Sequence, residues 1–117
     1  MEFVAASEHA LKIAKIAAQA AYDKKAENIV LLDVSEHLVI TDIFLIASAD
    51  NERQVGAIVD AIEAALDEID VDPIRREGNR EGRWVLLDYF DIVVHVQQDE
   101  ERSLYDLERL WSDCPHI

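Results

Sequence analysis

Apolar residues in the middle of the chain recur at the spacing of an α-helix. Asn51 and Gln54 approximate a capping box at the start of this segment. The apolar positions that follow fall at i, i+3, i+4, i+7, i+11 and i+14, and they are Val55, Ile58, Val59, Ile62, Leu66 and Ile69. Because such a stripe normally faces a protein core, the pattern predicts a helix that buries all of these side chains.

A second helix is predicted near the N-terminus. Ser7 is a suitable N-cap, and polar residues recur at helical spacing from Glu8 to Asp23, so this helix should run to about Lys25. Its other faces are dominated by alanine, whose short side chain allows close packing against a sheet.

Shorter apolar runs predict strands. The run Asn28–Val34 is too short for a typical helix and indicates a buried strand, and the β-branched and aromatic run Ile43–Ser48 indicates another. Residues Ile74–Arg76 fit a short edge strand, because a basic pair discourages pairing between the sheets of two molecules.

A β-hairpin is predicted from Trp84 onward, where two apolar runs meet at an Asp-Tyr-Phe-Asp corner. With Tyr89 and Phe90 as the loop residues, pairing would place the following partners opposite each other on one face: Asp88 and Asp91, Leu86 and Val93, Trp84 and His95. Two-residue loops favour Gly, Asn or Asp with positive φ, so a longer loop with another register stays open.

The facing carboxylates of Asp88 and Asp91 would repel each other, which suggests that they serve a purpose. They could bind a cation or a basic partner, or share a proton. The structural alternative is that both acids simply lie at a solvated hairpin tip.

The hairpin leads into a final helix, for which Asp99 is the expected N-cap. Its apolar seam consists of Leu104, Leu107, Leu110 and Trp111. Arg102, Tyr105 and Arg109 form an adjacent stripe, and an aromatic residue flanked by arginines is typical of a protein-binding hot spot. The alternative is an ordinary ion pair between Arg102 and Asp106, with Tyr105 at the core edge.

Length and charge narrow the choice of partners. The 117 residues suffice for one domain with its own core. The net charge of −14, from 25 acids against 11 lysines and arginines, disfavours direct nucleic-acid binding, which depends on basic contacts with phosphates. The same charge favours a basic partner, such as a protein that itself lies among nucleic acid, although plain solubility would also explain it.

The sequence also bounds the compartment. No stretch approaches the roughly 18 apolar residues of a membrane span, and the first residues lack the pattern of a signal peptide. The single cysteine, Cys114, cannot form an internal disulfide. We therefore expect a cytoplasmic protein that does not bind membranes.

Signatures of common enzymes are missing from the sequence: GxGxxG, P-loop, HExxH, paired CxxC and GxSxG motifs do not occur. The sequence accordingly predicts no catalytic residue, no cofactor and no metal ion. One enzymatic alternative remains, a metal-dependent nucleotidyltransferase-like enzyme whose Mg²⁺ would be held by Asp33, Asp42, Asp88 and Asp91. Caps and turn contacts explain these aspartates equally well.

Several segments, taken together, resemble the ribosomal silencing factors of the Iojap-like family. The matching pieces cover nearly the whole chain and are the strand with Asp33, Ile40-Thr41-Asp42, Arg53-Gln54-Val55, Glu77-Gly78, Trp84 to Asp88, Asp91 to His95, and Arg102 with Tyr105, Leu107, Glu108, Leu110 and Trp111. The chain departs from the family's usual pattern at Phe90 and Ala49, where glycine is common.

The resemblance implies an α/β fold: a single domain over residues 1–117, with a mixed sheet of about five strands flanked by three helices. This fold is similar to that of a nucleotidyltransferase but lacks the catalytic signature. The resemblance also implies a non-enzymatic repressor of translation, which binds the fourteenth protein of the large ribosomal subunit and blocks joining of the small subunit when nutrients are short.

The expected partner-binding residues come from the corner and the final helix: Trp84, Asp88, Tyr89, Asp91, His95, Arg102 and Tyr105. The acids should meet basic groups of the ribosomal protein, and the aromatic side chains should fill its surface. A third interpretation is a homodimerisation module without a ribosomal role, and a homodimer of the free protein is compatible with either view.

Overall fold

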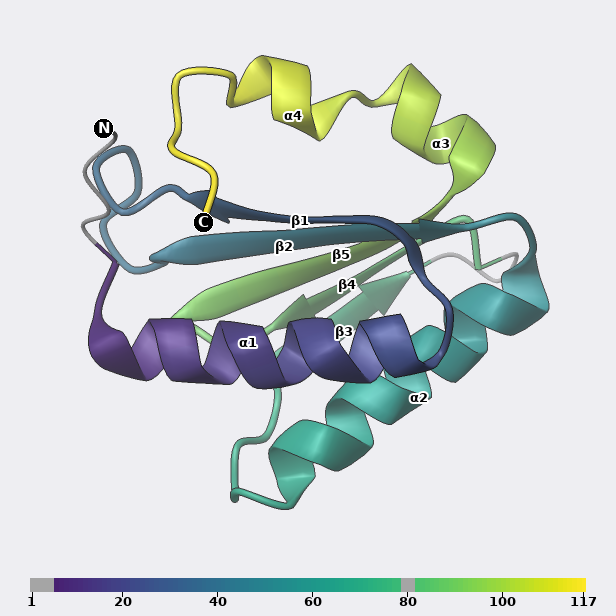
Figure 1. Cartoon of the computed structure of the whole chain (residues 1–117), viewed down its shortest axis with the longest axis horizontal. Coiled ribbons are helices and arrows are strands. Elements are labelled where there is room, and N and C mark those ends of the chain that lie inside the picture. The colour runs from purple at the N-terminus through teal and green to yellow at the C-terminus, as the bar shows by residue number, and fades with distance from the viewer. Residues whose placement is uncertain (1–5, 79–81) are drawn as a thin grey trace.

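A five-stranded sheet forms the centre of the molecule, with helices on both sides (Figure 1). The computed structural model describes residues 6–78 and 82–117. Helices α1 (Glu8–Asp23) and α2 (Glu52–Asp67) lie on one face, and the short helices α3 (Asp99–Leu104) and α4 (Leu107–Leu110) lie on the other. The expected α/β fold with a mixed sheet of five strands is confirmed.

The strand order is β1-β2-β5-β4-β3. The strands are β1 (Glu27–Asp33), β2 (Ile43–Ala49), β3 (Arg75–Gly78), β4 (Trp84–Asp88) and β5 (Ile92–Gln98). The central pair β2 and β5 is parallel and the other neighbouring pairs are antiparallel. The predicted edge position of the strand that carries Arg75 and Arg76 is confirmed, because β3 pairs only with β4 in the described part of the sheet.

Both long helices begin where their caps predict. The Ser7 hydroxyl accepts a hydrogen bond from the Ala10 N–H at 3.1 Å, and the Asn51 side chain accepts one from the Gln54 N–H at 2.8 Å. The apolar stripe of α2 is buried from Val55 to Leu66. Ile69 was expected in that stripe, but it lies beyond the end of the helix at Asp67 and is 38% exposed.

The sheet separates two apolar layers. The larger one lies under α1 and α2 and includes their buried isoleucines together with the inward side chains of the central strands. The smaller one, on the opposite face, contains Leu32, Val34, Phe44, Ile46 and Cys114, with Leu107 and Trp111 packed against it. Because α4 packs over the β1 and β2 side of this layer, the β4 side of the same face is left open.

The hairpin between β4 and β5 is confirmed, but its predicted register is wrong by two residues. The observed partners are Asp88 and Val93, Leu86 and His95, Trp84 and Gln97, so Asp88 does not face Asp91. Because side chains alternate with a period of two, this shift leaves the same residues on the same face of the sheet.

The connection in this hairpin is longer than two residues. The Tyr89 N–H donates to the Ile92 carbonyl, and the Asp91 N–H donates to the Tyr89 carbonyl, both at 2.9 Å. The second bond closes a γ-turn around Phe90, whose φ is +72°. This left-handed backbone favours glycine, which explains physically why a chain of this fold would use glycine at this position. Ala49 is not among the described residues with positive φ.

The single final helix that the sequence predicts is instead two short helices. Tyr105 has φ −109° and ψ 69°, which breaks the helix, and the Asp106 side chain then caps α4. Asp99 lies inside the first turn of α3, where Gln98 occupies the N-cap position without a side-chain bond. Leu104 and Leu110, expected in the apolar seam, are 71% and 74% exposed.

The chain ends beside the outer edge of β1. The Ile117 N–H donates to the Leu31 carbonyl, and the Asp33 N–H donates to the Pro115 carbonyl, both at 2.9 Å. His116 forms an antiparallel bridge with Leu32. This pairing fixes the segment after α4 against the sheet.

None of the described helices is both long enough and apolar enough to cross a lipid bilayer.

Candidate functional site

An apolar groove lies on the open part of the sheet, and we call it the β4–β5 groove. It has a volume of about 340 Å³ and is lined by Leu38, Val39, Ile40, Thr41, Phe44, Arg75, Leu86, Asp88, Val93 and His95. A second hollow of about 330 Å³ shares Leu86 and extends the groove to Trp84 and the edge strand. No helical residue of the described chain lines either hollow, so the groove is accessible to a partner.

Aromatic rings form one wall of this region. The Trp84 ring lies 6.0 Å from the His95 ring and 5.2 Å from the Tyr105 ring, measured between centroids. Phe44 contacts His95 edge-on at 5.0 Å. The structure thus brings Trp84, His95 and Tyr105 together, although Tyr105 comes from the break between α3 and α4. Rigid aromatic side chains of this kind are typical anchors of protein interfaces.

His95 is the buried member of this group. The Trp84 Nε1–H donates to His95 Nδ1 at 3.2 Å, which makes Nδ1 an acceptor and leaves the ring proton of the neutral side chain on Nε2. His95 Nε2 is buried and has no hydrogen-bond partner in the described structure. Burial lowers the pKa of His95 to about 4, so its imidazole is neutral at physiological pH. His95 therefore orients Trp84 and carries no charge that a partner could contact.

Asp88 lies at the rim of the groove. One carboxylate oxygen accepts the Phe90 N–H at 3.0 Å, and the other lies 3.5 Å from Arg75 Nε. The Asp88 side chain is 20% exposed. The groove thus combines an apolar floor with an acid and a base at its edge.

Asp91 and Tyr89 do not lie in the groove. Asp91 Oδ2 is 3.6 Å from His9 Nε2 on α1, and the Asp91 main-chain carbonyl accepts the Asp42 N–H. Tyr89 is 5% exposed and belongs to the layer under α1 and α2. Burial, followed by the charge of Glu63, raises its pKa to about 12. Tyr89 was expected among the partner-binding residues, but the structure buries its side chain on the other face of the sheet from the groove.

Arg102 stabilises the junction of α3 and α4. Its guanidinium binds Glu108 Oε1 through Nε at 3.1 Å and Nη2 at 2.6 Å, and it reaches Ser48 Oγ on β2 at 3.2 Å. Only 12% of the Arg102 side chain is exposed. Its ion-pair partner is Glu108 and not the Asp106 of the structural alternative, and its main effect is to hold the two short helices, and with them Tyr105, against the sheet.

The four aspartates of the enzymatic alternative do not converge on one point. Asp33 Oδ2 accepts the Ala6 N–H, and Asp42 Oδ2 accepts the Ser7 N–H, both at 2.9 Å. These two acids therefore hold the start of α1, where the helix dipole favours negative charge. Asp88 and Asp91 bind Arg75 and His9 instead. Within residues 6–78 and 82–117 the four acids form no cluster able to hold a metal ion.

The sequence missed the loop that forms the other wall of the groove. Val39 is fully exposed and Ile40 is 65% exposed. Both precede β2 and are separated from it by Thr41 and Asp42. Their apolar character outside a predicted helix or strand is the signal that could have indicated a surface role. A contiguous apolar patch on the surface is typical of a binding site, whereas single exposed apolar residues are common.

The comparison with known protein families agrees with these features. Residues 7–117 match the family model described as "Ribosomal silencing factor during starvation". The chain belongs to the ribosomal silencing factor family. This match includes the β4–β5 groove, the junction of α3 and α4, and the C-terminal segment beside β1. The family resemblance inferred from the sequence is confirmed.

Individual members of the family are similar over most of their length. The chain is 46% identical over 103 residues to the ribosomal silencing factor RsfS of Bacillus subtilis, covering 88% of this chain and 87% of that protein. It is 40% identical over 106 residues to RsfS of Halalkalibacterium halodurans, covering 91% of each. A crystal structure of a protein from Chromobacterium violaceum superposes with a TM-score of 0.84 at 37% identity, covering 87% of this chain and 85% of that one.

Proposed function

We propose that this chain represses translation by binding the large ribosomal subunit and preventing the small subunit from joining it. Its docking surface is the β4–β5 groove, and its partner is a basic component of the large subunit, the fourteenth ribosomal protein. The single observation that carries this proposal is the groove itself. An apolar, aromatic-walled groove without a covering helix, in a member of the ribosomal silencing factor family, is the surface best suited to hold a ribosomal protein.

The chemistry of the groove supports a protein partner. The side chains of Val39 and Ile40 are exposed, so a partner can cover them without breaking contacts within the fold. Burial of each side chain would contribute about 1.5 to 3 kcal/mol to the free energy of binding. Trp84 and Tyr105 add aromatic contact area beside them. Asp88 supplies a carboxylate at the rim, which can pair with a basic side chain of the partner.

The charge of the chain supports a basic partner. A net charge of −14 on 117 residues accelerates encounter with a positively charged protein and disfavours contact with exposed ribosomal RNA. The protein therefore finds its site through the ribosomal protein and not through the nucleic acid around it.

The mechanism of repression is steric. The folded chain measures 36 × 33 × 23 Å along its principal axes, so a copy bound at the face between the subunits occupies space that the small subunit needs. Such an obstruction requires a stable complex and no chemical step. The protein acts without catalysis, in agreement with the separate structural roles of Asp33, Asp42, Asp88 and Asp91.

Co-sedimentation with isolated large subunits, followed by a subunit-joining assay, tests the proposal. The wild-type chain should sediment with large subunits and reduce their pairing with small ones. Ile40→Glu and Asp88→Lys should each weaken binding by roughly 10- to 100-fold, equivalent to about 1.4 to 2.8 kcal/mol. Normal pairing of the subunits in a saturating excess of the chain would refute the proposal.

Matched controls locate the surface. Tyr22 is 64% exposed on α1, on the other side of the sheet, so Tyr22→Glu should bind like the wild type. Asp91→Lys reverses an acid that lies outside the groove and should also bind normally. Equal losses in the groove variants and these controls would place the interface elsewhere on the molecule. Tight, Mg²⁺-dependent binding of a nucleotide in a calorimeter would instead favour the enzymatic alternative.

A further inference from the structure

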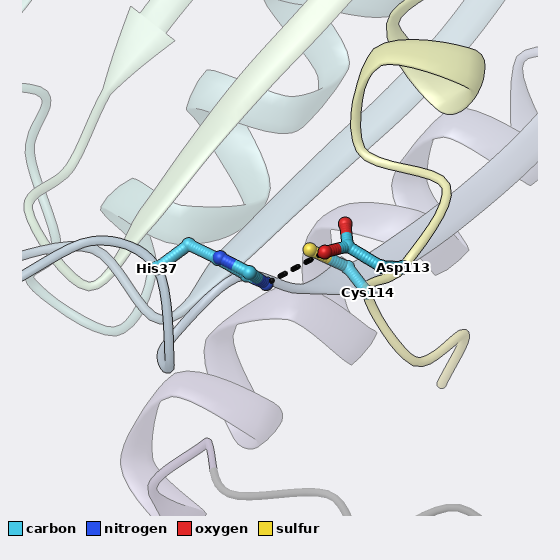
Figure 2. Close-up of side chains that lie close together, drawn as sticks. All are labelled: His37, Asp113 and Cys114. Carbon is cyan, nitrogen blue, oxygen red and sulfur yellow. Dashed lines mark ion pairs between the residues drawn. The ribbon is translucent and has the colours of Figure 1, made fainter.

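Three potential metal ligands meet at the C-terminal end of the chain, outside the β4–β5 groove (Figure 2). His37 comes from the turn after β1, and Asp113 and Cys114 come from the segment after α4. One ligand atom from each residue lies within 4.8 Å of the other two. His37 Nε2 and Asp113 Oδ2 lie 3.6 Å apart. Among the described residues no other trio of this kind occurs.

A nitrogen, an oxygen and a sulfur ligand together suit zinc, a metal ion of intermediate softness. Zinc binds a histidine nitrogen at about 2.0 to 2.1 Å, a carboxylate oxygen at about 2.0 to 2.2 Å and a thiolate sulfur at about 2.3 Å. In a tetrahedral site these lengths place neighbouring ligand atoms about 3.3 to 3.6 Å apart. The His37 and Asp113 atoms already have this separation, and the Cys114 sulfur lies within 4.8 Å of a ligand atom of each residue.

The backbone holds both ligand segments in place. The His37 N–H donates to the Val34 carbonyl at 3.0 Å, and the Cys114 N–H donates to the Trp111 carbonyl at 3.0 Å. The Trp111 ring packs edge-on against the His37 ring, with centroids 6.1 Å apart. The pairing of the last residues with β1 then fixes the segment that carries Asp113 and Cys114. A site assembled on fixed backbone loses little entropy when a metal binds.

Exposure and charge also fit a cation. Cys114 is 3% exposed, whereas the His37 and Asp113 side chains are 42% and 74% exposed, so a metal can enter from solvent and retain a water ligand. A bound cation would also offset the negative charge of the Asp113 carboxylate.

We propose that His37, Asp113 and Cys114 form a zinc site with water as the fourth ligand. When the metal binds, the zinc–sulfur bond replaces the sulfur–hydrogen bond of Cys114, and the thiol proton is released to solvent. The metal would join the turn after β1 to the C-terminal segment. Because Leu38, Val39 and Ile40 follow His37 along the chain and line the groove, zinc would also restrict the loop that forms one wall of the groove.

The alternative is an ordinary ion pair between His37 and Asp113, with Cys114 as a neighbouring apolar side chain. The molecule contains a matched control for it. His9 and Asp91 are also 3.6 Å apart and exposed to solvent, but they have no cysteine beside them in the described structure. A metal site therefore predicts that substitution of His37 weakens Zn²⁺ binding, whereas substitution of His9 does not.

Cobalt binding to the full-length chain tests the proposal directly. With Co²⁺ as the probe, the wild type should show a thiolate-to-cobalt charge-transfer band, visible bands of a tetrahedral ion, and one metal per chain by mass spectrometry. Cys114→Ser should lose the charge-transfer band. In competition with a chromogenic chelator, His37→Ala and Asp113→Asn should weaken Zn²⁺ binding by at least roughly tenfold, whereas His9→Ala should bind Zn²⁺ normally.

Fold integrity is checked by circular dichroism of each variant. Asp113→Asn changes a mostly exposed side chain, so it tests the site even where a substitution of the buried Cys114 unfolds the protein. A wild-type spectrum without the charge-transfer band would overturn the proposal. So would unchanged zinc affinity in Asp113→Asn, equal weakening by His9→Ala, or one metal shared between two chains.

Discussion

Acidification should destabilise this protein through His95, and the size of the effect follows from its burial. The side chain is 6% exposed, and burial lowers its pKa from 6.5 to about 4. Between these two values the unfolded chain binds more protons at this position than the folded chain does. The free energy of unfolding therefore falls as the pH falls from about 6.5 to about 4, and this contribution stays constant at lower pH.

The magnitude can be worked out from the shift. Each pKa unit corresponds to about 1.4 kcal/mol, so the full loss is on the order of 3 kcal/mol, and about 2 kcal/mol of it should have occurred at about pH 5. The structure also gives the local cause. A proton on Nδ1 would face the Trp84 Nε1–H, so two donors would meet where a hydrogen bond of 3.2 Å now exists.

Urea denaturation at about pH 7.5 and about pH 5, followed by tryptophan fluorescence and circular dichroism, measures the effect. His95→Gln is the control, because glutamine does not titrate and its side-chain oxygen can accept from Trp84. The wild type should lose about 2 kcal/mol more than the variant between the two pH values. If both proteins lose the same free energy, or if NMR finds a His95 pKa near 6.5, the reasoning is refuted.

Two further substitutions test the corner and the helix junction. Phe90→Gly should be more stable than Phe90→Ala by about 0.5 to 1 kcal/mol in thermal unfolding, because only glycine adopts φ +72° without strain. If the alanine variant is the more stable of the two, as at positions with negative φ, the left-handed corner is contradicted. Arg102→Ala should lower the free energy of unfolding by about 1 to 3 kcal/mol and raise hydrogen exchange in residues 99–111, because it removes the bonds to Glu108 and Ser48. Unchanged exchange in that segment would show that Arg102 does not hold the junction.

Local pattern was sufficient for the helices and strands that bury an apolar face. The caps at Ser7 and Asn51 and the stripe from Val55 to Leu66 located both long helices. They succeeded because a cap and a 3.6-residue period are properties of consecutive residues. The final helix differs from its local pattern because contacts between distant segments decide it. Leu107 and Trp111 of the predicted seam pack against the sheet but Leu104 and Leu110 are exposed, and the Arg102 contacts with Glu108 and Ser48, together with the Asp106 cap, favour two short helices.

The candidate site divides in the same way. Of the residues predicted to bind a partner, Trp84, Asp88 and His95 share one face of the sheet, because alternation along a strand fixes which side chains share a face even when the register shifts by two residues. Tyr105 reaches Trp84 from the break between α3 and α4. The sequence could not separate Tyr89 and Asp91 from these residues, since the direction of a corner side chain depends on the backbone of the turn. It also gave no sign that His37 meets Asp113 and Cys114, which lie far away along the chain.

By itself, then, the sequence determined the order and type of the elements, the acidity of the surface and the family, because these depend on neighbouring residues and on composition. Only the tertiary structure decided which sheet face stays uncovered, where Val39 and Ile40 lie, and how the last residues return to β1. These features depend on contacts between segments that are distant in the chain. Such contacts are selected by the packing of the whole core and leave no local pattern.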